Sequence, residues 1–536
     1  MHNFSRMRSL LGLLLGMLFI LSACSSTELS MKPISSSKTV NIGVTYSPNT
    51  LNPLSPVGQV SSYISGLMYL PLFELDQDLT FKPMLADSIT TMDHRLFTVN
   101  LNPSAEWSDG SPVTADDVVF TLELMTSREI ASSYAYMFAI IEGTDSTGFK
   151  LEGKSALAGV RAVDKHTLTI KTKEPTTLTI VQDTIGRNLF TLPKKALESV
   201  QVDQLRNGDF VQKSAVVSGP YRFDSYERDQ LVQMKANAAY FKGAPRIGRL
   251  NFKIVKDEAL ADQFESGDVD LNIPSFGVIP INDYGKIKSL PNVTAVNGPS
   301  ITTQFMYINE QELPDARQRQ AISYAINRER IVNDLLRGAG ETVDGLFTSY
   351  SPYLDPSVKQ AEYDPDKAKS LLAESGWVPG TKLTLSVLSG DSTLEQAAQM
   401  AANDLKDVGI DAEIQVINLA PLIHKIVEKD YDLGVMTVSM SLVNPLPDVS
   451  YFLQEGNPNG YRNPEVDKLL AALKSETREA DMKRTYSRLQ QIMAKDVPML
   501  SIYATRSLGV VNHAVTGVHP SDYGMFIDVQ DWDIKR

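Results

Sequence analysis

The chain has 536 residues, of which 43% are hydrophobic and 21% are charged, and its formal net charge is −13. This composition is that of a folded globular protein and excludes long disordered stretches. No cluster of Lys and Arg interrupts the negative charge, which argues against nucleic acid or a broad anionic membrane surface as partner. At about 150 residues per domain, the length predicts roughly three domains or subdomains.

The first 23 residues have the features of a secretory signal peptide. Arg6 and Arg8 precede an apolar run over residues 10–21, which is too short to span a bilayer core of roughly 30 Å. The run ends in Leu-Ser-Ala-Cys at Cys24 and resembles the bacterial lipobox, in which the cysteine is acylated and becomes the new N-terminus. The alternative is an ordinary signal peptide that ends near a cysteine. Cys24 is the only cysteine, so we expect no disulfide framework.

Residues 24–38 are polar and rich in serine, which predicts a flexible tether between a lipid anchor and the folded part. Beyond it, the β-branched residues of segment 40–44 predict a strand, and residues 46–53 predict a turn-rich loop. Residues 96–101 alternate like a second strand.

Residues 106–120 combine a strand end, a tight turn and a capped helix. The turn falls at Asp109-Gly110, where glycine can take a positive φ. Thr114 is the predicted N-cap, and Asp117 three residues later completes a capping box. From its local pattern alone, this segment is a scaffold corner and not a catalytic site.

The rest of the chain continues the alternation of strands and helices. Residues 160–171 predict a hairpin, and residues 303–309 predict a strand before a helical region at 315–328. Capping residues and apolar stripes predict three later helices. The first begins at Asp364-Pro365 and ends at Gly376, and the second begins at Asn463-Pro464. The third covers residues 482–493 and ends before Pro498.

Taken in order, these segments resemble the family 5 extracellular solute-binding proteins, the peptide- and nickel-binding receptors of ABC importers. The resemblance runs from residue 39 to the end. In the segments that carry the resemblance, Ser218 stands where the family usually has threonine, and Gln318 stands where it usually has valine. The strings that carry the resemblance are the tryptophan corner at 106–120, Gly-Pro-Tyr at 219–221, N-x-x-Y-F-x-G at 237–243, the turn at 264–270 and the arginine-rich string at 315–328.

The resemblance implies an α/β, two-lobed periplasmic-binding-protein fold with a hinge, and an extra α+β subdomain on the first lobe. Ligand would close the two lobes by a hinge motion. The implied boundaries are 39–76, 217–297 and 506–536 for the discontinuous first lobe, 77–216 for the extra subdomain and 298–505 for the second lobe.

The function implied is that of a substrate-binding lipoprotein of an ABC importer, which captures a small solute, above all a short peptide, and delivers it to a membrane permease. Its partners would be that solute and the permease subunits, with membrane contact through the lipid anchor only and no nucleic acid. We expect a monomer without cofactor, outside the cytoplasm, anchored at the cell surface or on the periplasmic face.

Two groups of alternatives stay open. Within the family the ligand could be a nickel chelate, and outside it a sugar or opine-like solute. A different class would be a lipid-anchored hydrolase, because a Ser-His-Asp triad can assemble from distant residues. However, the sequence has no H-E-x-x-H, C-x-x-C, G-x-S-x-G or P-loop string, and its six histidines are scattered. We therefore expect neither an enzyme nor a metal site.

Candidate ligand contacts lie in loops at strand ends, where a rigid scaffold carries binding residues. Peptide-binding relatives typically carry Trp-x-x-Asp in the segment that is 439–448 here, and its carboxylate receives the α-amino group of the peptide. This chain has neither the tryptophan nor the aspartate at the expected place, and Asp448 comes later. Here either Asp391 or Asp448 takes that role, or the ligand lacks a free amine at that position. We favour Asp391, because its loop has small residues that let a ligand backbone approach. The candidates are Tyr46, Asn49, Gln304, Ser389, Gly390, Asp391, Ser392, Ser439, Ser441 and Asp448.

Overall fold

The computed structural model describes residues 38–56, 58–208, 210–211 and 216–535. These residues belong to one unit that spans residues 35–536. The predicted signal peptide, the predicted lipidation site Cys24 and residues 24–37 of the predicted tether lie outside the described residues.

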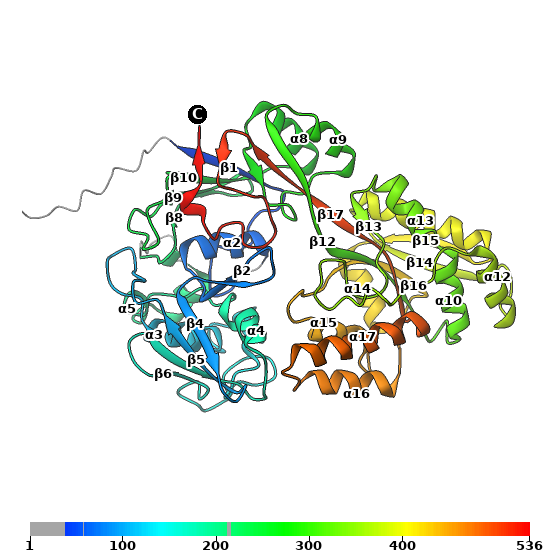
Figure 1. Ribbon diagram of the computed structural model, residues 1–536, viewed down its shortest axis with the longest axis horizontal. Helices are drawn as coiled ribbons and strands as arrows, with labels where there is room; N and C mark the ends of the chain where they lie inside the picture. The colour runs from blue at the N-terminus through cyan, green and yellow to red at the C-terminus, as the bar shows by residue number, and fades with distance from the viewer. Residues whose placement is uncertain (1–37, 57, 209, 212–215, 536) are drawn as a thin grey trace, which may run out of the picture. The chain divides into compact units, whose positions relative to one another are not determined.

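A mixed eleven-stranded sheet organises the structure (Figure 1). One end of it, which we call the β1 half, contains β8 (Tyr221–Glu227), β9 (Leu231–Ala236), β10 (Arg249–Ile254), β1 (Thr39–Val44) and β11 (Leu271–Asn272). The other end, the β14 half, contains β15 (Asp411–Ile417), β14 (Lys382–Leu388) and β16 (Leu433–Ser439), with the short β13 (Gly340–Glu341) paired to the edge of β17.

Two long antiparallel strands connect the halves. They are β12 (Val293–Ile308) and β17 (Met499–Asn512), which run side by side from one half to the other (Figure 1). Their pairing shifts register between Asn297 and Ser300, again between Ser300 and Thr302, and once more after Gln304. Such bulges bend a strand and weaken its ladder locally. The connection between the halves is therefore irregular near residues 297–305 of β12.

Residues 86–171 contribute a separate four-stranded antiparallel sheet, in the order β4 (Ala86–Thr91), β5 (Leu96–Leu101), β7 (Thr167–Lys171) and β6 (Val160–Ala162). The predicted strand at 96–101 and the predicted hairpin at 160–171 are both confirmed here. Two pairs of short strands lie elsewhere, β2 (Phe73–Leu75) with β3 (Phe81–Pro83) and β18 (Val515–Thr516) with β19 (Asp533–Ile534).

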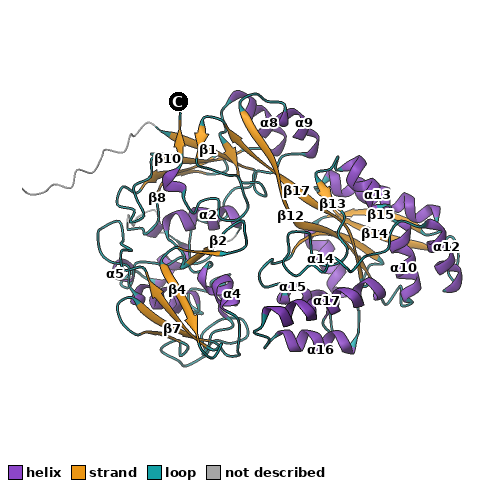
Figure 2. Cartoon of the chain, viewed as in Figure 1, coloured by secondary structure: helices purple, strands orange, loops and turns teal. Residues whose placement is uncertain are grey.

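Helices cover the sheets and fill the connections (Figure 2). The helices before β12 are α2 (Gln59–Met68), α3 (Ala115–Met125), α4 (Leu178–Val181), the π-helix η2 (Gln182–Gly186), α5 (Lys194–Leu197), α6 (Val202–Asn207), α8 (Asp257–Ser266) and α9 (Tyr284–Lys288). Those after it are α10 (Ala316–Ala325), α11 (Arg328–Arg330), the π-helix η4 (Ile331–Leu335), α12 (Pro365–Glu374), α13 (Ser392–Asp407), α14 (Leu419–Glu428), α15 (Leu446–Leu453), α16 (Pro464–Leu473) and α17 (Glu479–Asp496).

The helix starts follow the predicted capping chemistry. The side chains of Asp364 and Asn463 accept hydrogen bonds from the first turns of α12 and α16, each of which has proline at its start. Gly376, with φ of 73°, follows the end of α12 as predicted. The strand predicted at 303–309 is the end of the much longer β12.

The β14 half has two hydrophobic cores. One lies between α10, α12, α13 and the strands, and contains Ile322, Leu372, Leu405 and Val435. The other gathers α14 to α17 against β12, with Tyr486 among its buried members. Because each core is built from many fully buried aliphatic and aromatic side chains, this half forms a rigid support for the loops that β16 and β14 carry.

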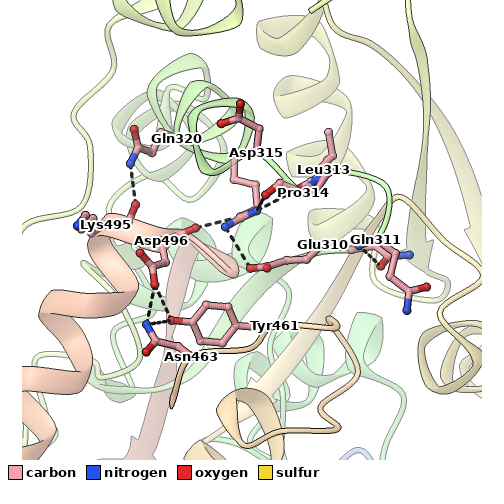
Figure 3. Close-up of polar contacts among 12 residues, drawn as sticks. Glu310, Gln311, Leu313, Pro314, Asp315, Gln320, Tyr461, Asn463, Lys495 and Asp496 are labelled. Carbon is pink, nitrogen blue, oxygen red and sulfur yellow. Dashed lines mark hydrogen bonds and ion pairs between the residues drawn. The ribbon is translucent and has the colours of Figure 1, made fainter. Parts of the chain in front are cut away.

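A polar cluster joins α10 to the end of α17. Arg319, only 4% exposed, forms an ion pair of 3.2 Å with Glu310. Tyr461 and Asn463 donate hydrogen bonds of 2.7 and 3.1 Å to the carboxylate of Asp496 (Figure 3). These contacts fix the turn after β12 against the start of α16.

Candidate functional site

The structure contains a partly open cavity of about 560 Å³. The cavity is lined by segments from both sides of the β12–β17 connection. These segments include α2 and η2 on one side and the loop from Ser439 to Val443 on the other. A further wall comes from the loop at residues 522–527, near the C-terminus. The volume is in the range of small-molecule and cofactor sites.

The lining is mixed in chemistry. Apolar side chains such as Leu67, Leu70, Phe190 and Phe526 cover much of the wall. The charged lining residues are Glu74, Asp183, Arg187, Asp448 and Asp522.

Arg187 is the cationic centre of the cavity wall. Its guanidinium lies 3.3 Å from the Asp183 carboxylate, one helical turn earlier, and 5.7 Å above the ring of Tyr523. Burial raises the pKa of Asp183, and the charge of Arg187 opposes this shift. Burial also raises the pKa of Glu74 to about 6, although Arg187 again acts in the opposite direction.

Asp448 lies in the first turn of α15, where the helix dipole favours a negative charge. One carboxylate oxygen accepts a hydrogen bond of 2.8 Å from the backbone N–H of Ser441. Burial raises the pKa of Asp448, and the neighbouring carboxylate of Asp183 raises it further. Asp183 is on η2 and Asp448 is on α15, so two different segments bring these negative groups near each other.

Asp522 is held by the fold itself. Its carboxylate accepts hydrogen bonds from the backbone of Ser275 at 2.8 Å and from the hydroxyl of Ser507 at 3.2 Å. The hydroxyl of Tyr63 donates to the backbone carbonyl of Asp522 at 2.7 Å. These bonds fasten the loop at 522–527 over the cavity.

Three of the residues chosen from sequence line this cavity, namely Ser439, Ser441 and Asp448. The other candidates lie elsewhere. Gln304 is 2% exposed and accepts a hydrogen bond of 2.6 Å from Thr437 on the neighbouring strand. Tyr46 is 59% exposed and does not line the cavity, and neither does Asn49.

The loop from Ser389 to Ser392 serves as the start of α13 and does not line the cavity. The carboxylate of Asp391 accepts hydrogen bonds from the backbone of Thr393 and Leu394, at 2.9 and 3.0 Å. The hydroxyl of Ser389 donates to Asn418 at 2.7 Å, and Gly390 adopts φ of 96°. Local capping therefore accounts for the Ser-Gly-Asp-Ser pattern.

Sequence reasoning missed Glu74, Asp183 and Arg187. Glu74 follows Leu72 and Phe73 in a short apolar stretch, and nothing in that stretch indicated a charged cavity wall. Asp183 and Arg187 are four residues apart, which is the spacing of an ordinary helical ion pair. The sequence carries no signal that this pair faces a cavity, because long-range packing sets that orientation.

The described residues contain neither a metal-binding group of side chains nor a helix that could span a membrane. No group of three or more His, Cys, Asp or Glu in this part of the chain could hold a metal ion. No helix within the described ranges combines the length and the apolar character needed to cross a membrane.

Solved structures share this architecture. The chain is 27% identical over 531 residues to the oligopeptide-binding protein AppA of Bacillus subtilis (strain 168), covering 92% of each sequence. The structure of AppA in complex with a nonapeptide has a TM-score of 0.72 at 23% identity, covering 93% of this chain and 99% of that one.

Two further structures give similar values. The ABC transporter substrate-binding protein CtaP from Listeria monocytogenes has a TM-score of 0.79 at 24% identity, covering 93% and 99% of the two chains. NikZ from Campylobacter jejuni in complex with Ni(L-His) has a TM-score of 0.73 at 20% identity, covering 92% and 99%. The predicted two-lobed α/β fold of the periplasmic-binding type is therefore confirmed.

The sequence match extends over most of the chain. Residues 80–460 match the family described as bacterial extracellular solute-binding proteins, family 5 Middle. Members of this family are solute-binding proteins for transport and not enzymes. With 381 of its 536 residues in this match, the chain belongs to the family 5 bacterial extracellular solute-binding proteins.

Proposed function

We propose that this protein is the substrate-binding component of an ABC importer and that it captures short peptides in the cavity. The observation that carries the proposal is the cavity of about 560 Å³, lined from both sides of the β12–β17 connection and bearing a carboxylate at Asp448. Membership of a solute-binding family and the oligopeptide-binding name of AppA support the same class of ligand. On this proposal the chain binds its solute without converting it.

The proposed lobes follow the boundaries set out from sequence. The first lobe would be 39–76, 217–297 and 506–536, with the subdomain 77–216 attached to it, and the second lobe would be 298–505. The register shifts of β12 begin at Asn297 and that strand meets β17 at Arg506, which supports a hinge at these boundaries. Closure about this hinge would enclose the ligand, and the permease would distinguish the closed receptor from the open one.

Asp448 would receive the α-ammonium of the peptide. It lines the cavity, it is half-buried, and its recorded hydrogen bond comes from a neutral N–H group. A desolvated ammonium requires a charged partner or several acceptors, and the hydroxyls of Ser439 and Ser441 lie on the same wall. Asp391, which the sequence favoured, is exposed and engaged in capping α13.

Calorimetry on two matched variants tests the assignment. Asp448→Ala should weaken binding of Ala-Ala-Ala by about 2–5 kcal/mol, the cost of leaving one charge buried without its partner. Asp391→Ala should leave the affinity within twofold of wild type. Near-wild-type affinity in Asp448→Ala would overturn the anchor. Recovery of a metal chelate or a carbohydrate by native mass spectrometry of the purified protein would overturn the peptide assignment.

We further propose that Cys24 carries the lipid that holds the receptor outside the cytoplasm beside its permease, as a monomer. The lipobox-like ending supports this proposal. Cys24→Ala should then leave the membrane fraction, and a variant retained there unchanged would contradict the anchor.

A further inference from the structure

The cavity wall has an excess of negative charge. Arg187 is the only cationic side chain among the described lining residues, and its ion pair with Asp183 offsets one carboxylate. The wall contains neither lysine nor histidine within the described part of the chain. Four carboxylates line the same cavity, those of Glu74, Asp183, Asp448 and Asp522.

The recorded hydrogen bonds to Glu74, Asp448 and Asp522 come from neutral donors, and of these three carboxylates only the pKa of Glu74 is lowered in part by the charge of Arg187. Glu74 and Asp448 each accept a hydrogen bond from a backbone N–H group, at 3.2 and 2.8 Å. Burial raises the pKa of both groups, which indicates that the surrounding protein stabilises their charged forms incompletely. A ligand that brings positive charge into the cavity would supply the missing stabilisation.

The cavity wall also has several aromatic side chains. The lining includes Tyr63, Tyr134, Tyr136, Tyr240 and Tyr523. Aromatic faces attract cations, so these side chains fit a positively charged occupant.

The described residues contain no group of three or more acidic, His or Cys side chains that could hold a metal ion, so the charge distribution fits an organic cation better. We propose that the cavity selects peptides with a basic side chain, with Asp448 receiving the α-ammonium and Glu74 receiving the side-chain cation. This inference rests on the proposed function of peptide capture and adds the charge of the ligand to it.

Calorimetry with three tripeptides at pH 7.5 tests the inference on the purified full chain. Ala-Lys-Ala should bind at least tenfold more tightly than Ala-Glu-Ala, and Ala-Ala-Ala should lie between them. Glu74→Gln and Asp183→Asn should each lower the ratio of the Lys to the Glu affinity at least threefold. Asp203→Asn, which removes a carboxylate that is 84% exposed and outside the cavity, should leave that ratio unchanged.

The outcomes separate this inference from the proposed function. If Ala-Glu-Ala binds as tightly as Ala-Lys-Ala, or if both cavity variants keep the wild-type ratio, the charge preference is overturned while peptide capture stands. If none of the three tripeptides binds, peptide capture itself fails and the inference fails with it. A melting temperature within a few degrees of wild type would show that each variant is folded.

Discussion

Arg319 illustrates at the scale of one residue how a polar side chain organises the β14 half. Its guanidinium donates hydrogen bonds to the backbone carbonyls of Leu313 and Pro314, at 2.8 and 3.0 Å, and to that of Asp496 at 2.9 Å. The ion pair with Glu310 adds the only charge partner within 4 Å among the described residues (Figure 3). One buried residue therefore donates hydrogen bonds to three carbonyl groups and forms an ion pair with one carboxylate.

We predict that Arg319→Met destabilises the protein by about 3–5 kcal/mol, because it leaves the carboxylate of Glu310 and three carbonyls without their donor. Arg317→Met is the matched control, since Arg317 is 47% exposed and its ion pair with Asp315 is at the surface. Surface pairs contribute about 0–1 kcal/mol. Chemical denaturation measures both losses, and equal small losses would show that the buried network contributes little.

Single residues also show which parts of the candidate site could be predicted from the sequence and which could not. Asp448 was a candidate because it lies just beyond the place where relatives carry the Trp-x-x-Asp carboxylate, and the structure places it on the cavity wall. Asp183 and Arg187 were not found, because an acidic and a basic residue four apart look like any helical surface pair. Asp391 was preferred for its small neighbours, but those neighbours fit a helix N-cap equally well. Which side chains meet in the cavity depends on packing between segments hundreds of residues apart.

At the scale of elements, α3 shows why the predicted start of a helix was confirmed by the structure. Asp117 is 6% exposed, and one of its carboxylate oxygens accepts hydrogen bonds of 2.8 Å from both the backbone N–H and the hydroxyl of Thr114. The other oxygen accepts a bond of 2.8 Å from the backbone of Lys194, at the start of α5. The first contact is local and was predicted, whereas the second is tertiary and was not.

We predict that Asp117→Ala lowers the free energy of unfolding by about 2–3 kcal/mol, since a lost cap costs about 1 kcal/mol and a second buried N–H group loses its acceptor. Asp116→Ala removes the adjacent, exposed carboxylate from the same first turn and should cost less than about 1 kcal/mol. Hydrogen exchange of α3 and α5 would locate the effect. Similar losses in the two variants would mean that helix-dipole charge, and not the buried contacts, stabilises this corner.

For the whole molecule, the long strands β12 and β17 could not be predicted in full from the sequence. Only residues 303–309 of β12 alternate clearly, and its earlier part contains Gly298 and Pro299, which normally indicate a break. In the structure these residues fall beside the register shifts, where an interrupted ladder tolerates them. The features that hid the strand from sequence reasoning are therefore those that support the proposed hinge.

Among the described residues, a hydrogen bond away from this hinge joins the proposed second lobe to the proposed extra subdomain. The hydroxyl of Tyr350 donates to the backbone carbonyl of Gln77, in the turn between β2 and β3. Burial raises the pKa of Tyr350 to about 12, so the phenol is protonated and able to donate at neutral pH. Glu341 holds the neighbouring Ser349 by two hydrogen bonds and forms an ion pair of 3.0 Å with Arg506 on β17, which ties this loop to the proposed hinge.

We predict that Tyr350→Phe makes a bound tripeptide dissociate about fivefold faster, because the enclosed form loses a hydrogen bond of about 1 kcal/mol and the equilibrium shifts toward the open form. The ring and its packing are retained, so stability should change little. Tyr363→Phe, at a tyrosine that is 45% exposed and does not line the cavity, is the matched control and should dissociate at the wild-type rate. Stopped-flow measurements with Ala-Lys-Ala give both rates. If Tyr350→Phe and Tyr363→Phe release the peptide equally fast, the contact with Gln77 does not stabilise the enclosed form, and closure depends on the ligand and the hinge strands alone.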